Sequence, residues 1–387
     1  IQRVGSDLLS LISEALGLLL AIPHSLRPAE VEVLETHLTR FKRLFRRQRF
    51  QKSNMRNLVR TAVTVMNIAF LAVKICRLHP EFRRDLRAIH DKDRIVYQSL
   101  FDVLIRPVKN QIPDKCDLTI LVSELMSRIP FEALIDRDRK RSEAYFIFPE
   151  RSFNYVRSPW LLNNLLKADE NTDTESRGRL LTLFTPLEPE SFESKDSFRF
   201  HELADSKARK RSSVLKWLAS EKATREAFIE LGPQSDCVLV ESHCTFDRAQ
   251  PFLSRILFAR GEPLSIIDLF ANHAFRLTSL MVLIACESDQ MFDQELEHVG
   301  VSVAEVMLCK GVDRIIAPMW TVERRVSREL VRRFVENECK GMHSMHALAK
   351  TQREQSIFSG LHPYFWAGFK FSGRTRYLDI SEVNSNG

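Results

Sequence analysis

A histidine and a cysteine each follow a short apolar stretch, and their chemistry suits the base and nucleophile of a thiol protease. His243 follows the stretch 237–242, and Cys286 follows the stretch 280–285. A cysteine peptidase attacks a peptide bond with a thiolate, which a neighbouring imidazole generates before protonating the leaving amine. Histidine suits both steps because it titrates near neutral pH. This pair is the strongest chemical signal in the sequence.

Each of the two residues also has a simpler interpretation. A cysteine after an apolar strand is commonly a small buried hydrophobic residue. A histidine at a strand end is commonly a hydrogen-bonded residue of the rim. The elements that precede them decide between the interpretations, because the carboxyl ends of neighbouring parallel strands line the ligand crevice of an open sheet.

The pattern after residue 112 is typical of alternating strands and helices. Short apolar, β-branched runs predict strands over 118–123, 144–148, 153–156, 179–184, 237–242, 279–285, 313–318 and 366–371. Helices are predicted over 201–218, 224–231, 300–309, 322–338 and 343–356, with a long connection over 244–278. This alternation indicates an α/β domain with a mostly parallel sheet flanked by helices.

The first 112 residues have a helical pattern instead. Apolar residues at helical spacing, with prolines near the ends, predict helices over 6–21, 29–48, 54–78 and 80–105. No convincing helical repeat is evident in this region. We therefore expect an all-helical region ahead of the α/β domain.

Composition restricts the compartment and the class of protein. No stretch reaches the roughly 18–20 apolar residues of a membrane span, so we expect no membrane contact. Seven scattered cysteines without zinc-site spacing favour reduced thiols and a cytoplasmic location. The first residue is Ile1 rather than methionine, and we expect the natural chain to begin upstream.

The positive charge of the chain is concentrated near its beginning. The 387 residues carry a net charge of +7, and between Thr36 and Pro80 there are eleven Lys or Arg residues and no Asp or Glu. One helix would carry Arg40, Arg43, Arg46 and Arg47 close together. Such a face suits a nucleic-acid backbone or an acidic protein, and a solvated surface is an equal alternative.

The region 113–373 resembles the CHAT domain, a caspase-like cysteine peptidase module related to caspases and separases. The resemblance rests on short motifs in a fixed order, each of them weak alone. They are Ile129-Pro130-Phe131-Glu132-Ala133-Leu134, Val240-Glu241-Ser242-His243, Leu283-Ile284-Ala285-Cys286-Glu287-Ser288, Ile316-Ala317-Pro318-Met319-Trp320-Thr321-Val322 and Trp366-Ala367-Gly368-Phe369.

The resemblance implies roles for three residues. His243 would be the general base and Cys286 the nucleophile, with the backbone amides of Cys244 and Cys286 stabilising the oxyanion. This chemistry requires no metal and no cofactor. Relatives usually have glycine where this chain has Cys244, which puts the local backbone conformation in question because glycine tolerates positive φ.

The resemblance also implies a domain organisation. Residues 1–112 would be a helical, regulatory region, 113–205 the inactive half of a caspase-like domain, 206–380 the active half and 381–387 a tail. Three further residues could form a substrate subsite. Glu287 and Asp289 would attract a basic substrate residue or lie in a solvated loop, and Trp320 would line the subsite or anchor the core.

These observations predict a partner-regulated cysteine endopeptidase that cleaves a protein substrate. The layout of helices before a CHAT domain is similar to that of the TPR-CHAT proteases of type III-E CRISPR systems. That similarity implies an RNA-guided effector ribonucleoprotein as partner, with RNA contact through the basic face. Two alternatives stay open: a catalytically inactive CHAT scaffold, and a nucleic-acid-binding helical protein with a structural α/β part.

Overall fold

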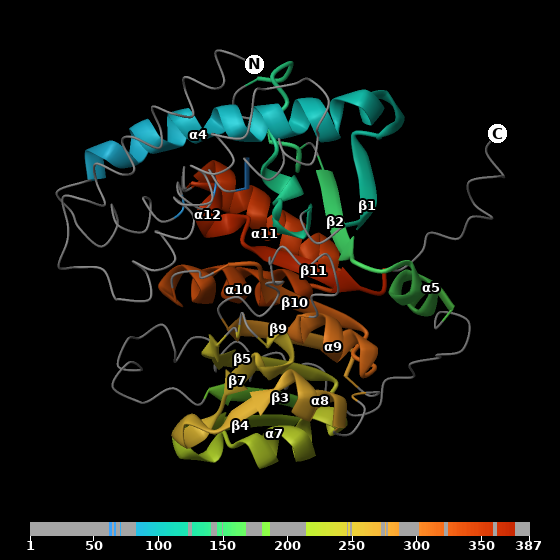
Figure 1. Ribbon diagram of the computed structural model, residues 1–387, viewed down its shortest axis with the longest axis vertical. Coiled ribbons are helices and arrows are strands. Elements are labelled where there is room, and N and C mark those ends of the chain that lie inside the picture. The colour runs from blue at the N-terminus through green and yellow to red at the C-terminus, as the bar shows by residue number, and fades with distance from the viewer. Residues whose placement is uncertain are drawn as a thin grey trace. The chain divides into compact units, whose positions relative to one another are not determined.

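The computed structural model describes residues 62, 63, 66, 70, 83–122, 126–140, 145–148, 150–167, 180–185, 214–245, 247, 250–271, 275, 278–285, 302–320, 324–358 and 362–375 (Figure 1). These residues fall into two compact units. Unit 1 comprises those within Ile1–Cys116, Arg128–Arg151 and Ser356–Tyr364, and unit 2 those within Asp117–Ser127, Ser152–Gln355 and Phe365–Gly387. None of the helices in these ranges is long and apolar enough to cross a membrane.

A six-stranded sheet organises unit 2. Its spatial order is β11 (Phe369–Gly373), β10 (Arg314–Pro318), β9 (Leu280–Ala285), β5 (Cys237–Ser242), β3 (Leu180–Thr185) and β4 (Val214–Ala219). Neighbouring strands from β10 to β4 are parallel, and β11 pairs with β10 in the antiparallel direction. The predicted α/β domain with a mostly parallel sheet is confirmed.

Apolar side chains cover both faces of the sheet, as expected for a buried parallel sheet. On one face, Val240 of β5 and Leu283 of β9 pack with α7 (Arg225–Leu231), α8 (Ile266–Ala271) and α9 (Val303–Cys309). On the other face, Leu239 of β5 and Ile284 of β9 pack with α10 (Arg324–Cys339) and α11 (Ser344–Phe358). Successive residues of a strand therefore point to opposite helical layers.

Hydroxyl residues begin two of the helices that cover the first face. The Thr224 hydroxyl accepts a hydrogen bond from the Ala227 amide at 3.1 Å, and the Ser302 hydroxyl accepts one from the Glu305 amide at 3.1 Å. Each satisfies a backbone donor that has no partner within its helix, which is worth about 1 kcal/mol. The local sequence thus sets where α7 and α9 begin.

A small antiparallel sheet occupies the region that was predicted as one long connection. It consists of β6 (Cys244–Thr245), β7 (Arg255–Leu257) and β8 (Pro263–Ser265), in that spatial order. The prediction missed these strands because two or three residues are too few to show an alternating pattern. The sheet continues directly from His243, so it bears on the candidate site.

The predicted helix over 201–218 is wrong at its end, where the chain forms strand β4 along β3. Leu215, Lys216 and Ala219 are compatible with a helix, and pairing with β3 overrides that propensity. The predicted strand over 144–148 is also wrong. Tyr145 makes an isolated bridge to Ile135, and a turn follows it.

Other predicted elements of unit 2 are confirmed within a few residues. The strand predicted over 237–242 is β5, the strand over 279–285 is β9, and the helix over 343–356 is α11. Several short elements lie in the described part of unit 2 or across its boundary with unit 1. They are α5 (Pro159–Lys167), α12 (Pro363–Trp366), η3 (Met126–Arg128), η8 (Ser220–Lys222), η9 (Gly232–Gln234), η10 (Pro251–Leu253) and η11 (Ala259–Gly261).

Unit 1 contains α4 (Arg83–Leu104), η2 (Arg106–Gln111), η4 (Phe131–Ala133) and the first residues of β1 (Lys115–Leu121) and β2 (Glu150–Val156). Its core includes Tyr97, Phe101, Phe131 and Phe146, all buried. The Phe101 and Phe146 rings meet edge to face with centroids 5.6 Å apart. Residues 129–134, the first motif of the CHAT resemblance, therefore belong to the hydrophobic core.

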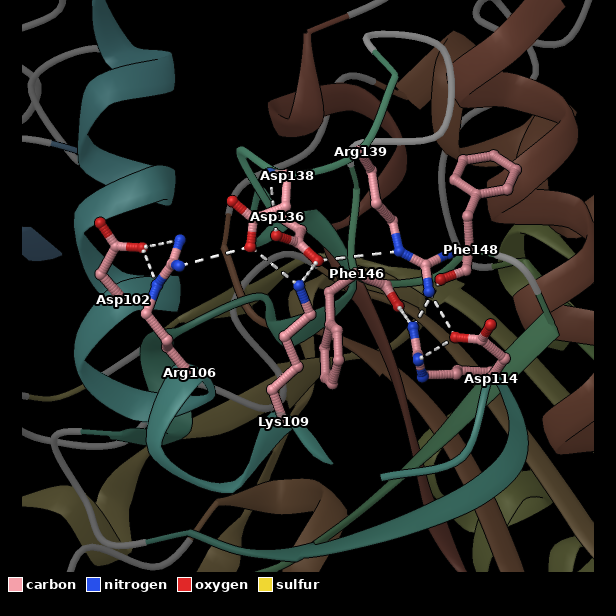
Figure 2. A network of polar contacts seen from close by, with 10 residues as sticks. Asp102, Arg106, Lys109, Asp114, Asp136, Asp138, Arg139, Phe146 and Phe148 are labelled. Atoms are coloured by element: carbon pink, nitrogen blue, oxygen red, sulfur yellow. Dashed lines mark hydrogen bonds and ion pairs between the residues drawn. The ribbon is translucent and has the colours of Figure 1, made fainter. Parts of the chain in front are cut away.

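Ion pairs join η2 of unit 1 to the segment after η4 (Figure 2). The Lys109 Nζ lies 2.7 Å from a carboxylate oxygen of Asp136 and 3.1 Å from one of Asp138. Asp136 also accepts a hydrogen bond from the Asp138 amide at 3.1 Å. The hydrogen bond that Lys109 donates to Asp136 raises the pKa of Lys109, and the one that it donates to Asp138 lowers the pKa of Asp138. The network of ion pairs continues from Asp136 through Arg139 to Asp114, which also pairs with Arg151.

Replacing the buried carboxylate of this network should destabilise unit 1. The Asp136 side chain is 4% exposed. The variant Asp136→Asn therefore removes a negative charge at a place where water cannot replace its interaction with Lys109. We expect the free energy of unfolding to fall by about 1–3 kcal/mol, as measured by denaturant titration. The control is Asp138→Asn, whose side chain is 57% exposed and whose replacement should cost clearly less stability. Equal losses in the two variants would contradict this assignment.

A histidine–aspartate pair connects α11 to β1 within unit 2. The His346 Nε2 lies 2.8 Å from an Asp117 carboxylate oxygen, and this hydrogen bond raises the pKa of His346. Ser344, the first residue of α11, accepts a hydrogen bond from Arg314, the first residue of β10, at 3.0 Å. The His346–Asp117 pair therefore lies near the edge of the sheet where the parallel strands begin.

The variant Asp117→Asn should return the pKa of His346 toward its ordinary value, as followed by NMR titration. A raised pKa stabilises the fold fully below the unfolded-state pKa of about 6.5, and the gain disappears as pH rises through the folded-state pKa. The native chain should therefore exceed the variant in stability more at pH ~6 than at pH ~8.5. Because both side chains are about half exposed, we expect a difference below about 1 kcal/mol. The other imidazoles serve as internal references and should not shift.

Candidate active site

His243 directly follows the last residue of β5, at the edge of the sheet where the parallel strands end. Ser242 of β5 is the register partner of Ala285 of β9. The next residues in the sequence are His243 and Cys286. Neighbouring strands lie about 4.8 Å apart. The pairing thus ends one residue before each member of the candidate dyad.

The strand order of the sheet reverses direction beside β5. The chain passes from β3 outward to β4, then returns to the opposite side of β3 to form β5, and continues through β9 and β10. In open parallel sheets, ligands bind outside the carboxyl ends of the strands at such a switch point. His243 therefore occupies the position where this class of fold places its binding crevice.

Hydrogen bonds connect the end of β5 to the small antiparallel sheet. The Ser242 hydroxyl donates to the Leu257 carbonyl, and the Leu257 amide donates to the His243 carbonyl at 2.9 Å. Ser242 is buried, while His243 is exposed. The backbone of His243 is thus fixed by β7, and its side chain is accessible to solvent.

Cys244 takes the position at which members of the family that the sequence resembles usually have glycine. It lies in β6 opposite Ile256, and its side chain packs against the apolar cluster on the α9 face of the sheet. Among the described residues, the non-glycine residues with positive φ are Ser220 and Arg260. Cys244 therefore has an ordinary extended backbone, which a cysteine adopts without strain.

Trp320 follows β10 near the same edge of the sheet. Its side chain is partly buried and packs against the apolar cluster beneath α10 and α11. The amide of Met319 donates to the Gly368 carbonyl at 2.8 Å, which holds the segment beside the start of β11. The core contacts agree with the anchor interpretation, and a role in a subsite stays a prediction.

Several predicted site residues lie outside the described residues. They are the nucleophile Cys286, the subsite residues Glu287 and Asp289, and the basic residues Arg40, Arg43, Arg46 and Arg47. Their roles stay predictions. Of the predicted dyad, the structure describes His243 and the strand that leads to Cys286.

The sequence interpretation missed an ion pair at the end of β5. The Arg328 Nε on α10 lies 2.7 Å from the Oε1 of Glu241, and both side chains are almost buried. The available signal was a carboxylate two residues before His243 in an otherwise apolar strand. Its partner is far away in the sequence, and no spacing rule connects the two.

Other titratable groups do not form a competing site in the described part of the chain. His346 has the perturbed pKa that often marks a functional residue, yet it lies near the opposite edge of the sheet from His243. Among the described residues, no group of three or more His, Cys, Asp or Glu side chains could hold a metal ion.

The chain is similar to one domain family and to two solved structures. The family model described as CHAT domain matches residues 94–374. Two crystal structures of the Saccharomyces cerevisiae separase–securin complex are similar over 96% and 97% of this chain, with 12% and 11% sequence identity and a TM-score of 0.46 for both. The chain spans 27% of the length of those matched chains, and the similarity assigns it no substrate and no partner. A search of curated proteins found no match. On the family match, the chain belongs to the CHAT domain family.

Proposed function

We propose that the chain is a cysteine endopeptidase in which His243 is the general base and Cys286 the nucleophile. The observation that carries the proposal is the pairing of Ser242 with Ala285. These are the residues immediately before the base and the nucleophile, on adjacent parallel strands. Membership of the CHAT family supports the reaction class, since the family resembles caspase-like peptidases.

Alternation along the strands supports the proposal further. Leu239 of β5 and Ile284 of β9 point to the α10 face, whereas Val240 and Leu283 point to the α9 face. Extending this alternation assigns His243 and Cys286 to the same face of the sheet. In this proposal the base and the nucleophile share adjacent strands and one face, as proton transfer between them requires.

The proposed reaction has two stages. The His243 imidazole takes the thiol proton of Cys286, and the thiolate attacks the carbonyl carbon of the scissile peptide bond. The tetrahedral oxyanion accepts hydrogen bonds from the backbone amides of Cys244 and Cys286. The imidazolium then gives its proton to the leaving amine as the C–N bond breaks, which leaves a thioester. Water, deprotonated by the imidazole, hydrolyses the thioester and restores the thiol.

The dyad should make Cys286 unusually reactive toward an alkylating reagent. In the native chain at pH ~7, we expect iodoacetamide to modify Cys286 faster than the other cysteines, because the thiolate is the reactive form. The variant His243→Ala should slow this modification by about 10-fold or more, as measured by peptide mass spectrometry over time. Unchanged modification in that variant would remove the base from the mechanism.

Cys309 offers a matched control within the same chain. Cys309 is exposed as a residue, so the reagent can reach it. Partial desolvation of its thiol raises its pKa, and the nearby Glu305 carboxylate raises it further. It should therefore react slowly at neutral pH, both in the native chain and in His243→Ala. Mapping of new protein termini with the native chain and with Cys286→Ala then tests peptidase activity directly. Identical termini with the two proteins would favour the inactive scaffold.

Regulation by a partner is a further part of the proposal. The basic segment between Thr36 and Pro80 motivates it, together with the similarity in layout to CHAT proteases of CRISPR systems. In this proposal, an RNA-guided effector ribonucleoprotein binds the helical region and controls a cytoplasmic peptidase. Attraction between the arginines and a phosphate backbone would contribute to binding.

Binding of RNA through the basic segment should depend strongly on salt. A variant with Arg43, Arg46 and Arg47 replaced by glutamine should bind a single-stranded RNA more weakly at ~50 mM salt. It should also reduce the slope of log affinity against log salt concentration by about 2, at about 0.7 per released phosphate contact. Fluorescence anisotropy measures both quantities. A variant with Arg332 and Arg333 of α10 replaced serves as control, and equal slopes in all proteins would assign the segment another role.

A further inference from the structure

Four large apolar side chains are exposed on two adjacent elements of unit 2. Ile267 and Phe270 belong to α8, and Phe252 and Leu253 belong to η10. Each of the four residues is between 40% and 51% exposed, and η10 lies against α8. We call these four residues the α8 patch. Single exposed apolar residues are ordinary on a protein surface, whereas a gathered set marks an interaction site.

Helix α8 is apolar on two faces, and its own unit covers one of them. Ile266 and Leu269 are buried in the apolar cluster on the α9 face of the sheet. Ile267 and Phe270 are three residues apart, so they share the exposed face. A helix that is apolar all round is typical of a buried position. The composition of α8 is therefore that of a helix which a partner covers on its second face.

Local hydrogen bonds hold the α8 patch in place. The Ile266 amide donates to the Ser254 carbonyl at 2.9 Å, which joins the start of α8 to the residue after η10. The Asp268 carboxylate accepts hydrogen bonds from the amide and the hydroxyl of Ser265 at 3.0 and 2.7 Å. A surface that is already ordered loses little conformational entropy on binding, which favours affinity.

Two cations border the α8 patch. The Lys310 Nζ donates to the Phe270 carbonyl at 3.0 Å, and the Arg255 Nε donates to the Thr245 hydroxyl at 3.2 Å. Both partners are neutral oxygen atoms, and in the described part of the chain neither cation has a carboxylate partner. Each cation therefore keeps a charge that a bound carboxylate could neutralise.

The acids beside the patch are engaged within the chain. Asp268 pairs with Arg225 at 3.3 Å, in addition to its hydrogen bonds with Ser265. Asp247 accepts a hydrogen bond from the Gln250 amide at 2.8 Å. The border of the α8 patch thus presents positive charge, which is complementary to an acidic partner.

We propose that the α8 patch is a docking site for a partner polypeptide whose apolar residues are flanked by Asp or Glu. The apolar residues would cover Ile267, Phe270 and their neighbours on η10, and the carboxylates would reach Lys310 and Arg255. Since η10 lies between β6 and β7, the docked polypeptide would contact the segment that follows His243. The inference goes beyond the proposed function, because docking needs neither the base nor the nucleophile.

Two synthetic peptides test the proposal by fluorescence anisotropy at ~50 mM salt. The first is a fluorescein-labelled amphipathic helix of about 16 residues, with Leu along one face and Glu on both flanks of that face. The second peptide has Lys in place of every Glu. We expect the native chain to bind the acidic peptide about 10-fold or more tightly than the basic one.

Variants of the chain locate the binding. The double variant Ile267→Gln with Phe270→Gln should weaken binding of the acidic peptide by about 10-fold or more. The matched control is Ile357→Gln, which changes a residue that is 55% exposed on α11, and it should bind like the native chain. If the α8 double variant does not fold, as checked by circular dichroism, Phe252→Gln with Leu253→Gln removes the η10 half of the patch instead.

Reversal of the border charges tests the chemistry of the partner. The variant Arg255→Glu with Lys310→Glu should prefer the basic peptide over the acidic one. Absence of binding to the native chain, equal affinities for the two peptides, or an unchanged preference in the charge variant would each overturn the proposal. Self-association of the native chain in sedimentation, abolished by Ile267→Gln with Phe270→Gln, would assign the patch to a second copy and would also overturn it.

The readout separates this inference from the proposed function. Peptide binding requires no peptidase activity and no reactive Cys286. If alkylation of Cys286 does not depend on His243, the proposed function fails, while selective binding of the acidic peptide would still establish the docking site. If alkylation depends on His243 and the acidic peptide does not bind, the function stands and the docking site is lost.

Discussion

The parallel pairing of β5 with β9 is the constraint on which the candidate site depends. The register runs from Cys237 opposite Leu280 to Ser242 opposite Ala285, and both strands are buried on both faces. A slip of one residue would send every side chain to the wrong helical layer. Burial thus specifies the register as far as Ser242 and Ala285, the residues that precede His243 and Cys286 in the sequence.

One polar exception to this apolar packing is informative. Glu241 places a carboxylate on the α10 face, where Leu239 and Ile284 are its apolar neighbours. Burying a charge is costly unless it is paired, and Arg328 provides the pairing.

The shifted pKa values of His346 and of the groups around Lys109 belong to ion pairs outside the candidate site. The pKa of His346 is raised by Asp117, and the groups around Lys109 are shifted by their mutual ion pairs. Both sets of shifts are explained by ion pairs, namely His346 with Asp117 and the network around Lys109 that Figure 2 shows. His243 stands out for a different reason, which is its place after a buried strand at the topological switch point. Topology is therefore the basis on which His243 is a candidate.

The sequence by itself determined the class of fold and the two positions of interest. The apolar runs before His243 and Cys286 are long enough and β-branched enough to predict buried parallel strands, and β5 matches its predicted range. The ordered motifs likewise indicated the CHAT domain, which the family match over 94–374 bears out. These features are local or sequential, so the sequence contains them in full.

Only the tertiary structure decided the features that depend on partners distant in the sequence. Strand β4 forms because β3 offers a pairing edge, although its residues are compatible with a helix. The antiparallel sheet after His243 uses strands too short to have a pattern of their own. The pairing of Glu241 with Arg328 joins a strand to a helix that only packing brings together. In each case the energy comes from a contact between distant segments, and such contacts are set by the fold as a whole.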